Sequence, residues 1–340
     1  MSASDFATRL VIWQKQHGRH DLPWQNTRDP YAVWLSEIML QQTQVSTVRD
    51  YFARFMQRFP RVADLAAASE DEVLALWSGL GYYSRARNLH RAAQQVVTLH
   101  GGAFPRNAEV LQSLPGIGRS TAAAVASLCF GERVAILDGN VKRVLTRFLG
   151  YADDLAQSRH ERALWALAQD LLPSERDMPT YTQAVMDLGA TVCTPRQPNC
   201  SACPVRADCV AAQQGQPERY PVKTRKLKRH SESWWLLVAR NPKGQVWLTQ
   251  RPAQGVWARL FCVPMFAQRD ELLAALPARV QAQVHEAPAF KHVLTHKDLH
   301  LHPVFVRLSR SDGWAEGEWV ADDDWPQRGL PTPIRKLLQT

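Results

Sequence analysis

The chain has 340 residues and a formal net charge of +9, with 45% hydrophobic and 21% charged residues. This length allows two domains with buried cores. The positive excess, most of which lies in the first 230 residues, suits a polyanionic partner such as nucleic acid. No apolar run approaches the roughly 18 residues of a membrane span, and Met1–Gln16 lacks the apolar core of a signal peptide. We therefore expect a soluble, cytoplasmic protein with no membrane partner.

The first two hundred residues have helical periodicity. The Asp-Pro pair before Tyr31 is a helix start and predicts a helix over Tyr31–Gln44, with Gln41 and Gln42 on the face of Trp34. Further helices are expected over 71–77, 85–100, 120–130 and 161–172.

A glycine hairpin lies at residues 114–121, which read LPGIGRST from Leu114 onward. Gly116 and Gly118 permit a tight turn whose backbone can approach another surface. The Ala-rich run after Ser120 predicts a helix whose N-terminal N–H groups suit a phosphate. The alternative is an ordinary helix–turn–helix corner. Asp138 stands between an apolar stretch and the next helix, which it is expected to cap.

A cysteine cluster follows, with the spacing C-x6-C-x2-C-x5-C at Cys193, Cys200, Cys203 and Cys209. Clustered cysteines in a cytosolic chain indicate a thiolate-bound metal rather than disulfides. Only one pair has the spacing of a zinc knuckle, whereas looser spacing permits a four-iron cluster, so iron–sulfur is favoured and zinc is the alternative. Arg196 in the turn between the first two cysteines would face a phosphate. Cys129 and Cys262 have apolar neighbours and are predicted core residues.

Glu37 is, after Asp138, the second acidic residue that is a candidate for a role in catalysis. It lies in residues 33–40, the most apolar helix of the chain. Desolvation of a carboxylate in such a helix would raise its pKa, so that it holds a proton near neutral pH. A Glu on the solvated stripe of an amphipathic helix is the alternative.

The pattern changes near residue 230. Residues 217–230 are basic and poor in apolar side chains, and they are interpreted as an exposed linker. Beyond the linker, a turn signal at Asn241-Pro242-Lys243-Gly244 separates two short β-type runs. A second, α+β domain is expected, with strands at 233–239, 246–250, 299–308 and 318–320 and a short helix at 270–276.

The hairpin, the aspartate and the four cysteines resemble, in order and spacing, the endonuclease III superfamily of DNA base-excision glycosylases. The chain is similar in particular to the MutY adenine DNA glycosylases, at residues 22–24, 35–45, 79–89, 137–144 and 186–190. This resemblance covers nearly the whole chain. It implies a mainly α helix-hairpin-helix glycosylase domain over 1–216 with its iron–sulfur loop at 193–209, the linker, and a Nudix-like lesion-recognition domain over 231–340.

The resemblance also implies a reaction. Adenine opposite 8-oxoguanine or guanine would be flipped out of the double-stranded DNA and excised. Glu37 would protonate adenine at N7, Asp138 would stabilise the cationic sugar, and Asn140 would position water or the sugar. Gln41 and Tyr82 match positions that enter the duplex around the extruded base. Candidates for the adenine pocket are Trp24, Glu161 and Gln183.

Ser120 separates two activities within the superfamily. Lyase members carry a lysine there whose amine forms a Schiff base, which a serine hydroxyl cannot do. The resemblance therefore implies an enzyme that leaves an abasic site, with at most a trace of imine trapping by Lys142. The implied cofactor is one [4Fe-4S] cluster on the four cysteines, and the implied state is a nucleoid-associated monomer. The expected DNA contacts are Gln41, Tyr82, Leu114, Gly116, Gly118, Ser120, Lys142 and Arg196.

The C-terminal domain resembles the Nudix-like domain of the same family. Residues 255–264 are similar to its Gly-x-Trp-x-x-Leu-x-x-x-Pro motif. The following residues 265–273 lack the glutamates that bind Mg²⁺ in a catalytically active Nudix hydrolase. The family's Phe-Ser-His lesion-reading loop corresponds to Leu294, Thr295 and His296, so the hydroxyl and imidazole are kept and the aromatic ring is not. The alternative is that these three residues only pack a β-turn.

Three other functions are alternatives for this sequence. An endonuclease III-like enzyme for oxidised pyrimidines is opposed by Ser120 and by the C-terminal domain. The chain could instead be a non-catalytic DNA-binding module whose iron–sulfur cluster only senses redox state or stabilises the fold. In that case, loss of the Glu37 or Asp138 carboxylate would have no effect. A Nudix hydrolase with a helical appendage is opposed by the missing glutamates.

Overall fold

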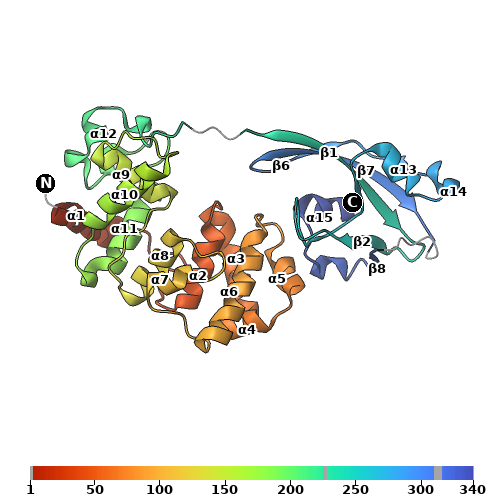
Figure 1. The fold of residues 1–340 in the computed structure, drawn as a ribbon, viewed down its shortest axis with the longest axis horizontal. Helices are drawn as coiled ribbons and strands as arrows, with labels where there is room; N and C mark the ends of the chain where they lie inside the picture. Colours follow the sequence, from red (N-terminus) through yellow and green to blue (C-terminus); the bar gives the residue numbers. More distant parts are fainter. Residues whose placement is uncertain (1–2, 225–227, 310–315, 340) are drawn as a thin grey trace. The chain divides into compact units, whose positions relative to one another are not determined.

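The computed structural model describes residues 3–224, 228–309 and 316–339 (Figure 1). The chain forms two compact units, one of residues 1–66 with 91–226 and one of residues 67–90 with 227–340. A helical segment from the first half of the chain thus belongs to the second unit. Of the predicted linker, residues 225–227 lie outside the described residues, and Tyr220 near its start is buried.

The first unit is helical. The helices predicted over 85–100, 120–130 and 161–172 are confirmed as α6, α8 and α10, whose bounds differ from the predicted ones by a few residues. The helices in this part of the chain are α1 (Ala3–His17), α2 (Pro30–Leu40), α3 (Val45–Arg58), α4 (Val62–Ala67), α6 (Ser84–His100), α7 (Ala108–Gln112), α8 (Arg119–Phe130), α9 (Gly139–Leu149), α10 (Ser158–Asp170), α11 (Met178–Thr191) and α12 (Val210–Gln213). No described helix is long and apolar enough to cross a bilayer.

Helix α2 is shorter than the sequence predicts. It starts after Asp29, whose carboxylate accepts a hydrogen bond from the Tyr31 N–H, and it ends at Leu40. Gln41 leaves the helical region at φ −57° and ψ 110°, and Gln42 has φ +57°. The predicted continuation to Gln44 is wrong because the chain turns here before α3 begins. Both glutamines therefore lie in a turn and not on a helix face.

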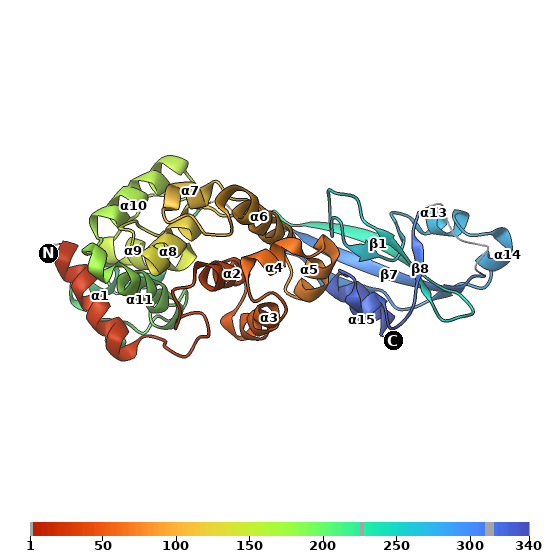
Figure 2. The same ribbon diagram turned by 90° about the horizontal axis from the view of Figure 1, so that it is seen from below.

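Helices α1, α9 and α11 share one core, where Phe6, Phe148 and Leu188 are buried together. The rings of Phe6 and Phe148 lie 4.3 Å apart between centroids. Helix α8 lies beside α2 and α11 in both views (Figures 1 and 2), and its alanines from Ala122 to Ala126 are buried. Small side chains let these helices approach closely. This packing brings the N-terminal ends of α8 and α9 to the C-terminal end of α2.

The second unit is built on a mixed sheet, and the predicted α+β domain is confirmed. The sheet order is β3-β2-β1-β7-β5, with β4 on β1, β6 on β7 and β8 on β2. The long strands β1 and β7 run parallel from the pair His230–Lys297 to the pair Arg240–Arg307. The strands are β1 (His230–Arg240), β2 (Val246–Gln250), β3 (Phe261–Cys262), β4 (Met265–Phe266), β5 (His285–Glu286), β6 (Phe290–Val293), β7 (Lys297–Arg307) and β8 (Glu318–Val320).

Among the described residues, the α-helices that lie wholly in the second unit are α5 (Glu70–Trp77), α13 (Arg269–Ala274), α14 (Ala278–Gln281) and α15 (Thr332–Leu338). Leu272 of α13 packs on the sheet beside Leu237 and Val304. The Ser78 hydroxyl, at the end of α5, donates to the Leu330 carbonyl at 2.7 Å and accepts from Arg335 of α15 at 3.1 Å. These contacts attach the segment 67–90 to the C-terminal domain.

Candidate active site

The glycine hairpin is anchored by apolar side chains. Leu114 is only 3% exposed, and its carbonyl accepts the Ile117 N–H at 3.2 Å. Its side chain therefore anchors the hairpin in the core, and the DNA contact expected at Leu114 stays a prediction. Gly116 has φ +76°, which glycine adopts at no steric cost. Gly118 is the N-cap of α8 and has no side chain to cap it, so the first N–H groups of α8 remain open to a phosphate.

Asp138 caps helix α9, as predicted. Its Oδ1 accepts the Val141 N–H at 2.7 Å, which fixes the carboxylate at the helix start. Burial raises the pKa of Asp138, while hydrogen bonds from the backbone of Val141 and Asn140 and the positive charge of Arg143 oppose that rise. The Asp138 carboxylate is therefore partly desolvated while its hydrogen bond to the Val141 N–H keeps it at the start of α9.

Glu37 lies one turn before the end of α2. Desolvation, with a further contribution from the negative charge of Asp138, raises the pKa of Glu37 to about 7. This direction agrees with the prediction from the sequence, and protonation of Glu37 near neutral pH stays a prediction. The alternative of a solvated helix stripe is wrong, because the helix around Glu37 is buried on nearly every side.

Two cavities meet at this pair of acids. The larger, of about 670 Å³, is lined at its polar end by Gln41, Ser120 and Asn140. The smaller, of about 160 Å³, is closed by Trp24 and Gln183. Both cavities are lined by Leu40, Thr43, Met186, Glu37, Asp138 and Asn140. The smaller cavity is the structure's candidate for the base pocket, and the larger one is also lined by Ser120 and Thr121 at the start of α8.

Glu161 does not reach either cavity. Its Oε1 accepts a hydrogen bond from the Lys142 ammonium at 2.5 Å. The structure thus separates Glu161 from Trp24 and Gln183, and the expectation that it lines the adenine pocket is corrected. Ser120 lines the larger cavity, and its Oγ accepts the Leu137 N–H at 3.0 Å. Arg196 is exposed in the cysteine loop.

Arg143 is a functional candidate that sequence reasoning missed. Its Nη2 donates to Asn140 Oδ1 and to the Gly189 carbonyl, each at 2.7 Å, and its Nε donates to the Cys193 carbonyl at 2.7 Å. One guanidinium therefore connects the catalytic candidate Asn140 to the first cysteine. The i, i+3 spacing of Asn140 and Arg143 on a helix was the available signal.

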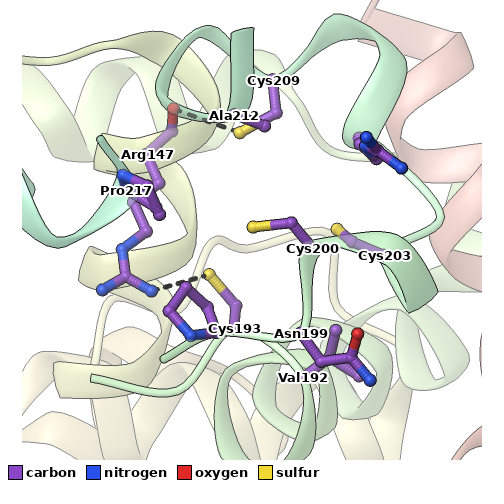
Figure 3. A pocket seen from close by; sticks show the side chains of 11 residues that line it. Arg147, Val192, Cys193, Asn199, Cys200, Cys203, Cys209, Ala212 and Pro217 are labelled. Carbon is purple, nitrogen blue, oxygen red and sulfur yellow. Dashed lines mark hydrogen bonds between the residues drawn. The ribbon is translucent and has the colours of Figure 1, made fainter. Parts of the chain in front are cut away.

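The four clustered cysteines line one pocket (Figure 3). Their sulfur atoms face a common space, and Arg147 borders it. The Arg147 guanidinium donates to Cys193 Sγ at 3.4 Å and to the Thr194 and Pro195 carbonyls at 2.7 and 3.0 Å. Burial raises the pKa of the Cys203 thiol to about 12. In the described part of the chain, no three His, Cys, Asp or Glu side chains are arranged to hold a metal ion.

In the second unit, Tyr82 meets the predicted lesion loop. Leu294, Thr295 and His296 form the tip between β6 and β7, closed by the Leu294 N–H donating to the Lys297 carbonyl at 2.8 Å. The Tyr82 hydroxyl and Thr295 Oγ1 are hydrogen-bonded, and Tyr82, with φ +48°, is 41% exposed. A cavity of about 580 Å³ lies beside them, with Trp257 and His292 in its wall.

Comparisons with known proteins agree with this fold. Residues 35–170 match the model of the HhH-GPD superfamily base excision DNA repair proteins, and residues 235–340 match that of the NUDIX domain. The structure of a thermostable thymine-DNA glycosylase is 31% identical, with a TM-score of 0.54, over 62% of this chain and 97% of that one. An endonuclease III in a non-covalent DNA complex has the same fold, at 21% identity and a TM-score of 0.52, over 63% of this chain and 98% of that one. Fold and site define a helix-hairpin-helix DNA glycosylase of base excision repair.

Curated relatives narrow the class. The adenine DNA glycosylase of Buchnera aphidicola subsp. Acyrthosiphon pisum is 36% identical over 98% of this chain and 97% of its own length. The adenine DNA glycosylase of Mus musculus is 50% identical over 62% of this chain and 42% of its own length. The chain therefore belongs to the adenine DNA glycosylase (MutY) family.

Proposed function

We propose that this enzyme excises adenine paired with 8-oxoguanine or guanine in double-stranded DNA by acid-assisted hydrolysis of the N-glycosidic bond. The observation that carries the proposal is the position of Glu37 beside Asp138, on the wall of a cavity that Trp24 and Gln183 also line, where burial raises the pKa of Glu37 to about 7. Adenine is a poor leaving group as an anion, so a proton delivered to the base is the chemical requirement. Glu37 supplies it at N7.

Asp138 and Asn140 complete the mechanism. As the bond to the base breaks, positive charge develops on the sugar, and the Asp138 carboxylate stabilises it. Asn140 lines the same cavities and positions water or the sugar, held by its hydrogen bond from Arg143. Ser120 places a hydroxyl, with no nucleophilic amine, at the edge of the larger cavity, so the product is an abasic site and not a cut strand.

The four cysteines fit a [4Fe-4S] cluster. A single tetrahedral zinc needs four sulfurs at about 2.3 Å from one point, whereas a four-iron body takes them farther apart. The four sulfurs surround a common space, which supports the cluster. When bound, the cluster would join the loop 193–209 covalently through its iron–sulfur bonds. Visible absorption near 400 nm and about four irons per chain test this, since zinc(II) is colourless.

We assign residues 1–216 to the glycosylase domain, 217–230 to the linker and 231–340 to the lesion-recognition domain. Thr295 and His296 offer a hydroxyl and an imidazole to 8-oxoguanine, and Leu294 offers an apolar contact. Tyr82, hydrogen-bonded to Thr295, belongs to the same surface. The enzyme acts as a monomer on nucleoid DNA. Light scattering of the free protein and of its DNA complex tests the monomeric state.

The deciding experiment measures single-turnover release of adenine from a duplex with adenine opposite 8-oxoguanine. Glu37→Gln and Asp138→Asn are each expected to slow release by at least about 10²-fold, the lower end of the contribution of a positioned acid or base. Glu109→Gln, in the exposed first turn of α7, is the matched control and should equal the wild type. Unchanged adenine release in both active-site variants would overturn the mechanism.

A further inference from the structure

A fully buried carboxylate lies behind the candidate base pocket. Asp187 of α11 is 0% exposed, and it accepts five hydrogen bonds. Oδ1 accepts from Arg19 Nε at 2.8 Å, Arg19 Nη2 at 2.5 Å and Gln183 Nε2 at 3.0 Å. Oδ2 accepts from the Arg19 backbone N–H at 2.9 Å and from Gln14 Nε2 at 3.0 Å. Nothing in the proposed mechanism uses Asp187 itself.

Two of its partners, Arg19 and Gln183, line the smaller cavity with Glu37. An ionised carboxylate accepts hydrogen bonds and donates none, so the amide nitrogen of Gln183 must face Asp187. The amide oxygen of Gln183 is then the group left for a ligand. Arg19 adds further N–H donors from a guanidinium that Asp187 holds in place.

The amide oxygen of Gln183 is a hydrogen-bond acceptor, so it matches a base edge that carries a donor. Adenine carries an exocyclic amino group that donates hydrogen bonds, whereas guanine carries a carbonyl oxygen at the same position, which accepts them. An amide oxygen fixed in the wall accepts from the amino group of adenine and repels the carbonyl of guanine. If the Gln183 amide turned over, the preference would be reversed.

We propose that Asp187 is a positioning residue that fixes the orientation of the Gln183 amide and of Arg19, and so selects a base with an exocyclic amino group. This inference rests on the proposed function, because it takes the smaller cavity to be the adenine pocket. Asp187 acts only through Arg19 and Gln183 and touches no reacting atom. Its effect is therefore on the choice of base and not on the delivery of the proton.

The test compares two leaving bases in the same duplex, adenine and unsubstituted purine, which lacks the amino group. The readout is the ratio of their single-turnover excision rates in each protein, so differences in intrinsic reactivity cancel. Asp187→Asn offers one oxygen where the carboxylate offers two, and it cannot satisfy all five donors. It is expected to lower the adenine-to-purine ratio about fivefold, the worth of one neutral hydrogen bond. Gln183→Met, similar in size but apolar, is expected to lower it equally.

Because the adenine-to-purine ratio reports the amino group that the Gln183 amide reads, adding Asp187→Asn to Gln183→Met should not lower the ratio further. Thr182→Val is the matched control: Thr182 lies on α11 with Asp187, its buried hydrogen bond goes to Ser127 of α8, and neither residue lines the cavity, so the variant should keep the wild-type ratio. Thermal melting identifies a misfolded Asp187→Asn; Gln183→Met can then still overturn the inference, because an unchanged ratio would show that the Gln183 amide does not read the amino group. An unchanged ratio in a folded variant overturns the inference and leaves the function intact. A wild type that releases no adenine overturns both.

Discussion

Asp138 and Glu37 line the same two cavities, and the negative charge of Asp138 adds to desolvation in raising the pKa of Glu37 to about 7. The pair resembles the two carboxyl groups of a glycoside hydrolase, one of which holds a proton while the other faces positive charge. Here the two acids come from the end of α2 and the start of α9. Their proximity makes the protonation of Glu37 depend on Asp138.

The first prediction concerns the pH dependence of excision. Glu37 must be protonated to act, so the single-turnover rate should be highest below pH 7 and fall about tenfold per unit above it. Rates measured with saturating enzyme, after DNA binding has been checked at each pH, give this profile. A rate that is flat through pH 7 would contradict the assignment of Glu37 as the acid.

The second prediction concerns stability. The folded-state pKa of Glu37 lies above its ordinary value of 4.5, so the folded state binds the proton more tightly than the unfolded chain. Stability from this group is therefore complete below pH 4.5 and is lost as pH rises through 7. Glu37→Gln has no such loss and should be more stable than the wild type above pH 7, by up to about 3 kcal/mol.

Denaturant unfolding of both proteins on either side of this window measures the difference. The gain of the variant should vanish below pH 4.5, because Glu37 is then protonated in both states. A gain that is equal at both pH values would show that the variant acts through packing and not through the proton.

The third prediction concerns Arg143. Arg143→Gln removes the guanidinium that holds Asn140, Gly189 and Cys193, and it should lower both adenine excision and cluster retention, with a loss of roughly 2–3 kcal/mol in stability. Arg133→Gln is the matched control, because Arg133 also donates to two carbonyls, those of Pro173 and Leu172, but away from both sites. Full excision with a lost cluster, or the reverse, would show that Arg143 does not couple them.

The fourth prediction concerns Lys142. Its ammonium is paired with Glu161, so the wild type should give little borohydride-trapped protein–DNA adduct. Glu161→Gln removes the carboxylate and should raise the trapped fraction several-fold, because the amine becomes free to attack an abasic sugar. Adding Lys142→Ala should abolish that increase. If trapping persists without Lys142, another amine is responsible.

The fifth prediction concerns the lesion loop. Tyr82→Phe and Thr295→Val each break the same hydrogen bond, and each should reduce the preference for 8-oxoguanine over guanine by about fivefold. The double variant should be no worse than either single variant if the two hydroxyls act as one unit. Fully additive losses in binding would show that each contacts the lesion separately.

The sequence by itself determined the local features of the site. The glycine hairpin, the cap at Asp138, the acid in an apolar helix and the cysteine spacing are each contained within a few consecutive residues, where backbone preferences and side-chain patterns act directly. The two-domain organisation follows from the change of periodicity near residue 230. These features were sufficient to indicate the family.

Only the tertiary structure decided the features that join distant segments. Arg19 and Asp187 are 168 residues apart, and their ion pair exists because α1 packs against α11. Glu161 forms an ion pair with Lys142 and does not line the smaller cavity, and the Leu114 side chain is buried under the glycine hairpin. The segment 67–90 packs on the C-terminal domain, so Tyr82 meets Thr295. Such contacts depend on how helices and strands pack, which no local pattern encodes.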